Sequence, residues 1–200
     1  MIGLLMSGGL DSSSLAYMLR PDIAFNVNYG QKPASAERQA TEAICKELNI
    51  RVINLDIDCT SLGSGDLSDN NAIDVAPESD WWPYRNQLLI TLAAMKAVSS
   101  GCTKLLIGTV ASDEYHLDGT ATFIKKINDL ISYQEGNIQI EAPAIGLTAT
   151  ELIRKSGIPF GLLAYSHSCH KSNIPCVNCR GCYKHYDTLR QLGIYNDELG

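Results

Sequence analysis

The chain has 200 residues, of which 45% are apolar and 19% charged, and its formal net charge is −6. This composition is typical of a globular protein with its own core and excludes a largely disordered chain. The acidic balance argues against a broad nucleic-acid or membrane-binding surface, and no stretch of about 18 apolar residues predicts a transmembrane helix.

The N-terminal half alternates apolar strands with helices. Residues 2–6 form a short apolar run without preceding positive charge, which predicts a buried strand and not a signal peptide. We therefore expect a cytoplasmic protein, whose cysteines stay reduced. Hydrophobic periodicity predicts further strands at 23–29 and 51–57 and helices at 12–19 and 34–48.

The middle of the chain begins with a long interruption. Residues 59–80 are rich in Ser, Gly, Asp and Asn and predict a loop, which at this length is usually functional or mobile. Regular patterns then resume with helices expected at 84–99 and 121–134, and with strands at 104–110 and 138–142.

The C-terminal part carries weaker signals. A capping box that starts at Thr148 predicts a helix over 151–156, irregular chain follows, and a helix is expected at 183–192. Strands that alternate with helices predict an α/β, Rossmann-like, mostly parallel five-stranded sheet with helices on both faces. We expect residues 1–160 to form this domain and residues 161–200 to form a cysteine-rich segment and helix packed on it.

A glycine turn joins the first strand to the first helix. It reads Ser7-Gly8-Gly9-Leu10-Asp11-Ser12. The two glycines allow positive φ and close approach of a ligand, and the backbone N–H groups at a helix start favour an anion. Because no Lys-Ser/Thr pair follows, the turn is not a Walker A loop.

This turn resembles the PP-loop of the ATP pyrophosphatases. In that family the loop holds the pyrophosphate that leaves when a substrate oxygen attacks the α-phosphate of ATP. Asp11 would repel the phosphates unless Mg²⁺ or a fixed hydrogen bond offset its charge. A plain Gly-Gly turn with a serine cap is the alternative reading.

Four of the seven cysteines lie close together near the C-terminus, with the spacing C-x6-C-x2-C-x2-C. They are Cys169, Cys176, Cys179 and Cys182. Four thiolates suit a closed tetrahedral Zn²⁺ site with a structural role. An iron–sulfur cluster or free thiols remain alternatives.

Charged residues and histidines flank these cysteines. We expect Arg180 and Lys184 to offset the net negative charge of a Zn(Cys)4 centre. His167, His170 and His185 could each replace a cysteine, but with four thiols present we expect them at the surface or supporting the ligands.

With the turn and the cysteines together, the chain resembles the 7-cyano-7-deazaguanine synthase (QueC) family over nearly its whole length. The matching strings are Tyr29-Gly30-Gln31, Pro83-Tyr84-Arg85-Asn86, Ile107-Gly108, Phe123-Ile124, Ala142-Pro143 and Ser168-Cys169. The resemblance implies an adenine nucleotide alpha-hydrolase (HUP-type) fold and a likeness in function: ATP activates the carboxylate of 7-carboxy-7-deazaguanine, and ammonia converts it to the nitrile through an amide.

The resemblance also implies partners and site residues. ATP, Mg²⁺ and Zn²⁺ are the expected cofactors, and a homodimer that binds neither nucleic acid nor membrane is the expected assembly. The expected nucleotide-binding residues are Ser7, Gly8, Gly9, Leu10, Asp11, Ser12, Tyr29, Gln31 and Gly108. The expected substrate-binding residues are Arg85, Asn86, Asp113, Asp118, Phe123 and Trp82. Asp11, Ser12 and Arg85 are the expected catalytic residues.

One segment departs from the family pattern. The family carries Asp-Cys-Arg-Pro-Glu-Phe where this chain keeps only Asp118 and Phe123. A second reading is therefore a QueC-like paralogue that activates a deazapurine or related carboxylate and stops at an amide, or transfers the group to another acceptor. A zinc-stabilised nucleotide-binding module without turnover and a tRNA thiolation enzyme are two further readings, which the intact turn and the acidic charge disfavour.

Overall fold

The computed structural model describes residues 1–113 and 116–194. Its centre is a five-stranded parallel sheet with the strand order β3-β2-β1-β4-β5. The strands are β1 (Ile2–Leu5), β2 (Ile23–Asn28), β3 (Arg51–Asp56), β4 (Lys104–Ile107) and β5 (Gln139–Glu141). The order reverses at β1, and the carboxyl ends of β1 and β4 therefore border the crevice in which such sheets bind ligands.

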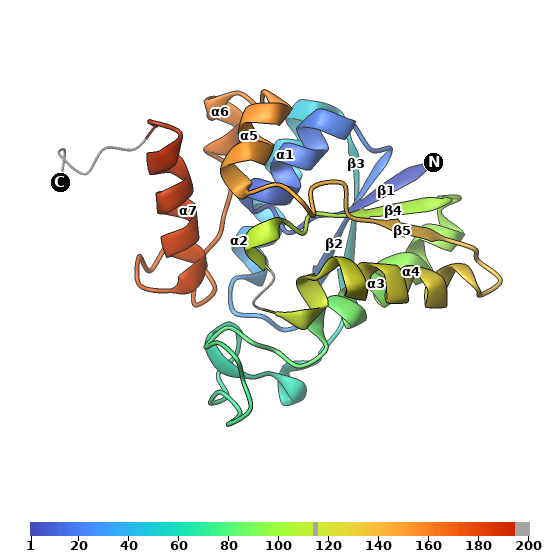
Figure 1. The fold of residues 1–200 in the computed structure, drawn as a ribbon, viewed down its shortest axis with the longest axis horizontal. Helices are drawn as coiled ribbons and strands as arrows, with labels where there is room; N and C mark the ends of the chain where they lie inside the picture. The colour runs from blue at the N-terminus through green and yellow to red at the C-terminus, as the bar shows by residue number, and fades with distance from the viewer. Residues whose placement is uncertain (114–115, 195–200) are drawn as a thin grey trace.

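Helices cover both faces of this sheet (Figure 1). The α-helices are α1 (Leu10–Leu19), α2 (Ala34–Leu48), α3 (Arg85–Ser99), α4 (Ala121–Ser132), α5 (Ala149–Ser156), α6 (Phe160–Leu163) and α7 (Arg180–Gln191). Short 3-10 helices are η1 (Thr60–Leu62), η2 (Gly65–Leu67), η3 (Ala111–Asp113) and η4 (Leu117–Gly119). Within the described ranges, no helix is long and apolar enough to cross a membrane.

Two apolar clusters hold the layers together. Leu4 and Leu106 of the sheet pack with α1, α2, α5 and α6, while Phe25 and Leu105 pack with α3 and α4 on the opposite face. Strand β2 is buried on both faces along most of its length, as central strands of parallel sheets are. Burial of this apolar area is the main force that fixes the sheet and its register.

Most predicted elements are confirmed, with differences at their ends. The capping box at Thr148 is present, with its side chain accepting from the N–H of Glu151. The chain after residue 157, expected to be irregular, contains the short helix α6. Helix α7 begins at Arg180, earlier than predicted, because the Cys179 sulfur accepts a hydrogen bond from the N–H of Cys182 and so caps the helix.

Candidate active site

A cleft of about 310 Å³ opens at the carboxyl ends of β1, β2 and β4. It brings together ten residues expected at the site from the sequence: Ser7, Gly9, Leu10, Asp11, Ser12, Tyr29, Arg85, Asn86, Gly108 and Asp113. The start of α7 and the chain before it form the opposite wall, through residues such as His167 and Lys184. The cleft therefore lies between the sheet and the cysteine-rich segment.

The glycine turn is tightly packed from behind. Gly8 has φ +73°, and a Cβ there would lie 2.7 Å from the Cβ of Ala40 and 2.7 Å from the carbonyl oxygen of Glu37. The carbonyl of Gly8 accepts a hydrogen bond from the N–H of His167 at 2.9 Å. Only glycine fits this backbone without strain, so the turn is held between α2 and the C-terminal segment.

The start of α1 faces the cleft. Its N-cap is Gly9, and among the described residues no side chain caps it. The hydroxyls of Ser12 and Ser13 instead donate to the carbonyl of Gly9, at 3.2 and 2.7 Å. Gly108, whose Cβ would lie 3.3 Å from the Ser12 backbone, lets β4 approach this turn. The first N–H groups of α1 thus remain available for phosphate oxygens.

Asp11 is bound by a cation from the far end of the chain. Lys184 of α7 places its Nζ 2.9 Å from Asp11 Oδ2 and 2.9 Å from Asp113 Oδ1. Burial raises the pKa of Asp11 above its ordinary value, and Lys184 offsets only part of this. The two carboxylates raise the pKa of Lys184, although burial acts in the opposite direction. Lys184 was expected to balance the cysteine centre; the structure directs it into the cleft.

Arg85, at the first residue of α3, lines the cleft near Tyr29 and Glu37. Burial opposes its charge, but Tyr29, Asp118, Asp80 and Glu37 outweigh this and raise the pKa of Arg85. Burial raises the pKa of Glu37 to about 7, with a hydrogen bond from Gln31 acting against it. The cleft thus contains a fixed cation beside a carboxyl group that can titrate near neutrality.

Gln31 shapes the turn after β2. Its Oε1 accepts from the N–H of Tyr29 at 2.9 Å, and its Nε2 donates to Val27 O at 3.2 Å and to Glu37 Oε2 at 2.8 Å. The side chain is 3% exposed and is not among the described cleft-lining residues. Its contact with a nucleotide, expected from the resemblance, would therefore be indirect, through Tyr29 and Glu37.

Asp80 lies at the end of the long loop and is 4% exposed. Its carboxylate lies 3.4 Å from His116 Nε2, 3.2 Å from His170 Nδ1 and 3.5 Å from Arg180 Nη1. Burial disfavours its charge, but the hydrogen bond from His116 and the nearby positive charges outweigh burial and lower the pKa of Asp80. Asp80 thus joins the loop to the cysteine-rich segment, and Arg180, which was expected to offset the charge of the cysteine centre, lies beside this carboxylate.

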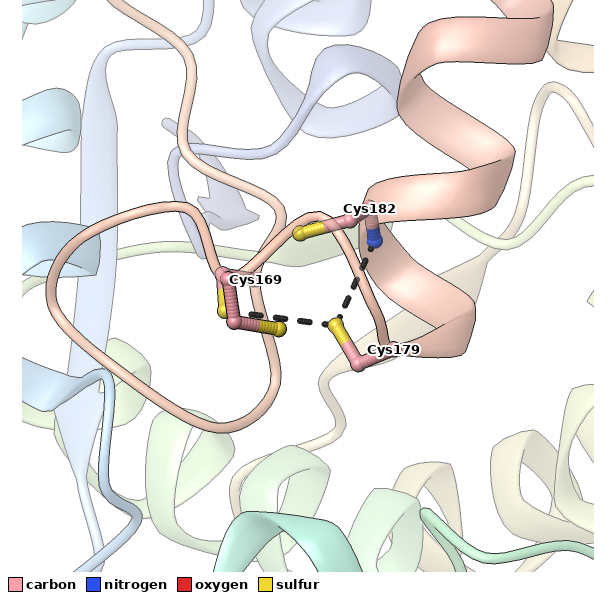
Figure 2. A group of neighbouring side chains, drawn as sticks. Cys169, Cys179 and Cys182 are labelled. Carbon is pink, nitrogen blue, oxygen red and sulfur yellow. Dashed lines mark hydrogen bonds between the residues drawn. The ribbon is translucent and has the colours of Figure 1, made fainter.

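The four cysteines gather beside the start of α7. Their sulfur atoms all lie within 4.8 Å of one another, and Cys169, Cys179 and Cys182 are each 2% exposed. Figure 2 shows these three side chains close together, with the Cys179 sulfur accepting from the N–H of Cys182 at 3.4 Å. The N–H of His170 donates to the same sulfur at 3.4 Å. Four clustered thiols with backbone donors fit a tetrahedral metal ion.

Three residues expected to bind substrate lie elsewhere. Trp82 is 2% exposed and packs edge-to-face on Tyr29, with ring centroids 4.9 Å apart. Phe123 packs against the apolar cluster beneath α3 and α4. Asp118 accepts a hydrogen bond from the backbone N–H of Asn86. None of the three is among the described residues that line the cleft, because packing and capping occupy them.

Other cleft residues gave little signal in the sequence. Glu37 belongs to the expected helix at 34–48, Asp80 to a polar loop, and His116 to the chain just before the divergent string. In the sequence each looks like an ordinary exposed polar residue, so none was predicted at the site. Their only sequence clue is proximity to a matched string, as Asp80 precedes the Pro83 turn by three positions.

Comparison with known proteins finds relatives over nearly the whole chain. A family model described as "Queuosine biosynthesis protein QueC" matches residues 2–193. Three relatives named 7-cyano-7-deazaguanine synthase are 26, 32 and 30% identical, from Methanosarcina mazei, Methanosphaerula palustris and Campylobacter curvus. Each alignment covers 95% of this chain and 93 or 94% of the relative.

A solved structure shares the fold at greater distance. The U34-tRNA thiolase NcsA from Methanococcus maripaludis, with its [4Fe-4S] cluster, matches with a TM-score of 0.56 and 16% sequence identity. The match covers 96% of this chain and 66% of the thiolase. At this identity the likeness concerns the fold alone.

Proposed function

We propose that this chain, which belongs to the QueC family of queuosine biosynthesis proteins, forms 7-cyano-7-deazaguanine from 7-carboxy-7-deazaguanine, ammonia and ATP. The chain is an ATP-dependent enzyme of the PP-loop type. The observation that carries the proposal is the shared cleft, in which the glycine turn faces Arg85 and Asn86.

The first half-reaction is carboxylate activation. A carboxylate oxygen of the substrate attacks the α-phosphorus of ATP, the bond to the β-phosphate oxygen breaks, and pyrophosphate leaves. The N–H groups at the start of α1 stabilise the leaving pyrophosphate, and Arg85 neutralises charge on the reacting groups. Ammonia then displaces AMP and forms the amide, with loss of one proton.

The second half-reaction uses another ATP. The amide oxygen attacks the α-phosphorus and pyrophosphate leaves again; loss of AMP and of the nitrogen-bound protons leaves the nitrile. Glu37, whose pKa lies at about 7, is the cleft residue suited to accept such a proton. Asp11 and Asp113 carry the oxygen ligands that Mg²⁺ prefers, and a bound Mg²⁺ would neutralise phosphate charge.

The thiols of Cys169, Cys176, Cys179 and Cys182 would hold Zn²⁺ with no open position. When bound, the metal would supply a rigid base for α7 and no reaction chemistry. Cys179 caps α7, so the thiols position the cleft wall that carries Lys184.

A second candidate is a QueC-type enzyme that activates a related carboxylate and stops at the amide or transfers the group. The engagement of Asp118 with Asn86, and of Asp113 with Lys184, favours it. Both carboxylates are among the expected substrate-binding residues, and these contacts occupy them.

One assay separates the candidates. The purified protein is incubated with ATP, 7-carboxy-7-deazaguanine and ammonia, and AMP, amide and nitrile are followed by mass spectrometry. We expect AMP and nitrile to accumulate in a ratio of about two to one, since two activations are needed. AMP with amide but no nitrile would support the second candidate, and no AMP would contradict both for this substrate.

A further inference from the structure

Lys184 forms ion pairs with two carboxylates, that of Asp11 in the glycine turn and that of Asp113. Among the described residues, no other side chain links the glycine turn to another carboxylate in this way. It lies two positions after Cys182, in the second turn of α7. Its two partners come from distant elements: Asp11 from the first turn of α1 and Asp113 from the end of η3. One ammonium group therefore holds two carboxylates at the place where ATP phosphates must enter.

The charges at this point do not balance. Two carboxylates face one ammonium, so the group keeps a net negative charge that repels a triphosphate. Asp11 Oδ1 is buried and has no hydrogen-bond partner among the described residues. An unsatisfied buried oxygen costs free energy, and a further cation or donor that reaches it would remove this cost.

The side chain of Lys184 can reach more than one position. An ammonium on a four-carbon stem is a mobile point charge with three donors. Its side chain is 34% exposed, so it is not locked by packing on all sides. The N–H of His167 also holds the carbonyl of Gly8, so the segment that carries Lys184 is fixed against the turn while the ammonium can move.

We propose that Lys184 exchanges partners during nucleotide binding. In the nucleotide-free protein it holds Asp11 and Asp113, and when ATP enters with its divalent cation the ammonium turns to the phosphates. The two carboxylates are then free to bind the divalent cation. This rests on ATP binding at the glycine turn and is independent of which carboxylate the enzyme activates.

The exchange predicts effects of opposite sign in one variant. Lys184→Met removes the competing cation, so Mn²⁺ alone should bind more tightly, by about tenfold, when free Mn²⁺ is followed by electron paramagnetic resonance. The same variant should bind α,β-methylene-ATP with Mn²⁺ about 10-fold to 100-fold more weakly by calorimetry, since one charged contact to phosphate is lost. Lys184→Arg should retain most of the nucleotide affinity.

Matched measurements exclude a general effect. Lys126→Met, at an exposed position of α4, removes the same charge far from the cleft and should change neither affinity. Thermal unfolding and metal content of each variant report the fold and the cysteine centre. Weaker binding of both Mn²⁺ and nucleotide by Lys184→Met would overturn the exchange. Unchanged affinity for both ligands would overturn it as well.

A failure of the nucleotide site itself has a different signature. If the wild-type protein does not bind α,β-methylene-ATP with Mn²⁺, the assignment of the glycine turn fails together with the exchange. If the wild type binds the analogue, but Lys184→Met has the same affinities for Mn²⁺ and nucleotide as the control Lys126→Met, then only the exchange is wrong. The proposed substrate is tested separately, by the products of the complete reaction.

Discussion

The carboxylate of Asp118 accepts a hydrogen bond from the backbone N–H of Asn86 at 3.2 Å, and the Asn86 side chain donates to the Asp118 carbonyl at 3.0 Å. Helix α3 starts here with Tyr84 in the left-handed region at φ 56°, and among the described residues no neighbouring side chain caps it. Asp118, more than thirty residues away in the sequence, thus caps the helix that carries Arg85.

Asp118→Ala should therefore reduce stability and nucleotide affinity together. Loss of a helix-capping carboxylate costs about 1–2 kcal/mol, to be measured as the free energy of unfolding in urea. Asp129→Ala, which removes an exposed i,i+4 pair with Lys125, should cost much less. An unchanged free energy of unfolding, combined with lost binding of the deazapurine, would instead mean that Asp118 contacts the substrate.

Gly8→Ala should disable nucleotide binding. The new Cβ would meet Ala40 and the Glu37 carbonyl at 2.7 Å, with φ at +73°, so the turn must shift. Strain of this kind costs about 1–3 kcal/mol, and loss of α,β-methylene-ATP binding is the decisive measurement. Gly146→Ala, where a Cβ meets nothing within 4 Å, serves as the control. Normal binding by Gly8→Ala would show that the turn tolerates a side chain.

Glu37 should make stability depend on pH. Its pKa is raised from 4.5 to about 7, so its protonated form is favoured by folding. The stabilisation is complete below about pH 4.5 and is lost as the pH rises to about 7. A shift of this size is worth about 3 kcal/mol at full burial, and we expect about 1–2 kcal/mol because the group borders an open cleft.

The control for this pH dependence is Glu37→Gln. The amide can still accept from Gln31, so the hydrogen bond at 2.8 Å is kept while the titration is removed. Thermal unfolding of both proteins across this pH range should show the wild type losing stability relative to the variant. Parallel curves for the two proteins would contradict the raised pKa.

Asp80→Asn should loosen the long loop from the cysteine-rich segment. The change leaves His116, His170 and Arg180 without their shared carboxylate, and breaking a buried ionic contact costs about 3 kcal/mol. Asp69→Asn, in the same loop but 97% exposed at its side chain, should cost almost nothing. Hydrogen exchange over residues 59–84 should become faster only in Asp80→Asn, and equal exchange in both variants would exclude this role.

Cys179→Ser should remove the metal and weaken the start of α7. The sulfur caps the helix and accepts from the N–H of His170, so its loss affects both. We expect about one zinc ion per chain in the wild type, none in the variant, and a fall in thermal stability. Cys102→Ser, in the core beneath α3 and α4, should keep the metal. A visible absorption band with bound iron would identify an iron–sulfur cluster instead.

Local hydrophobic pattern was sufficient to predict most helices and strands of the fold. Helix α2 has the limits that its periodicity predicts, 34–48, because an amphipathic face defines both of its ends. The strands were located by their apolar residues, and their ends differ from the prediction by one to three residues, since strands end where pairing ends and not where apolar residues do. Helix α6 was missed because four residues are too short for a periodic signal.

The candidate site divides in the same way. Local sequence pattern identified the glycine turn, the four cysteines and the string around Arg85, because in each case the residues lie close together along the chain and suit one kind of ligand. Three contacts could be found only in the folded chain: Lys184 binds Asp11, Asp80 faces two histidines and an arginine, and Asp118 caps α3. Such contacts join residues 32 to 173 positions apart, and no local pattern specifies them; they form because burial of the apolar layers brings these charged groups together.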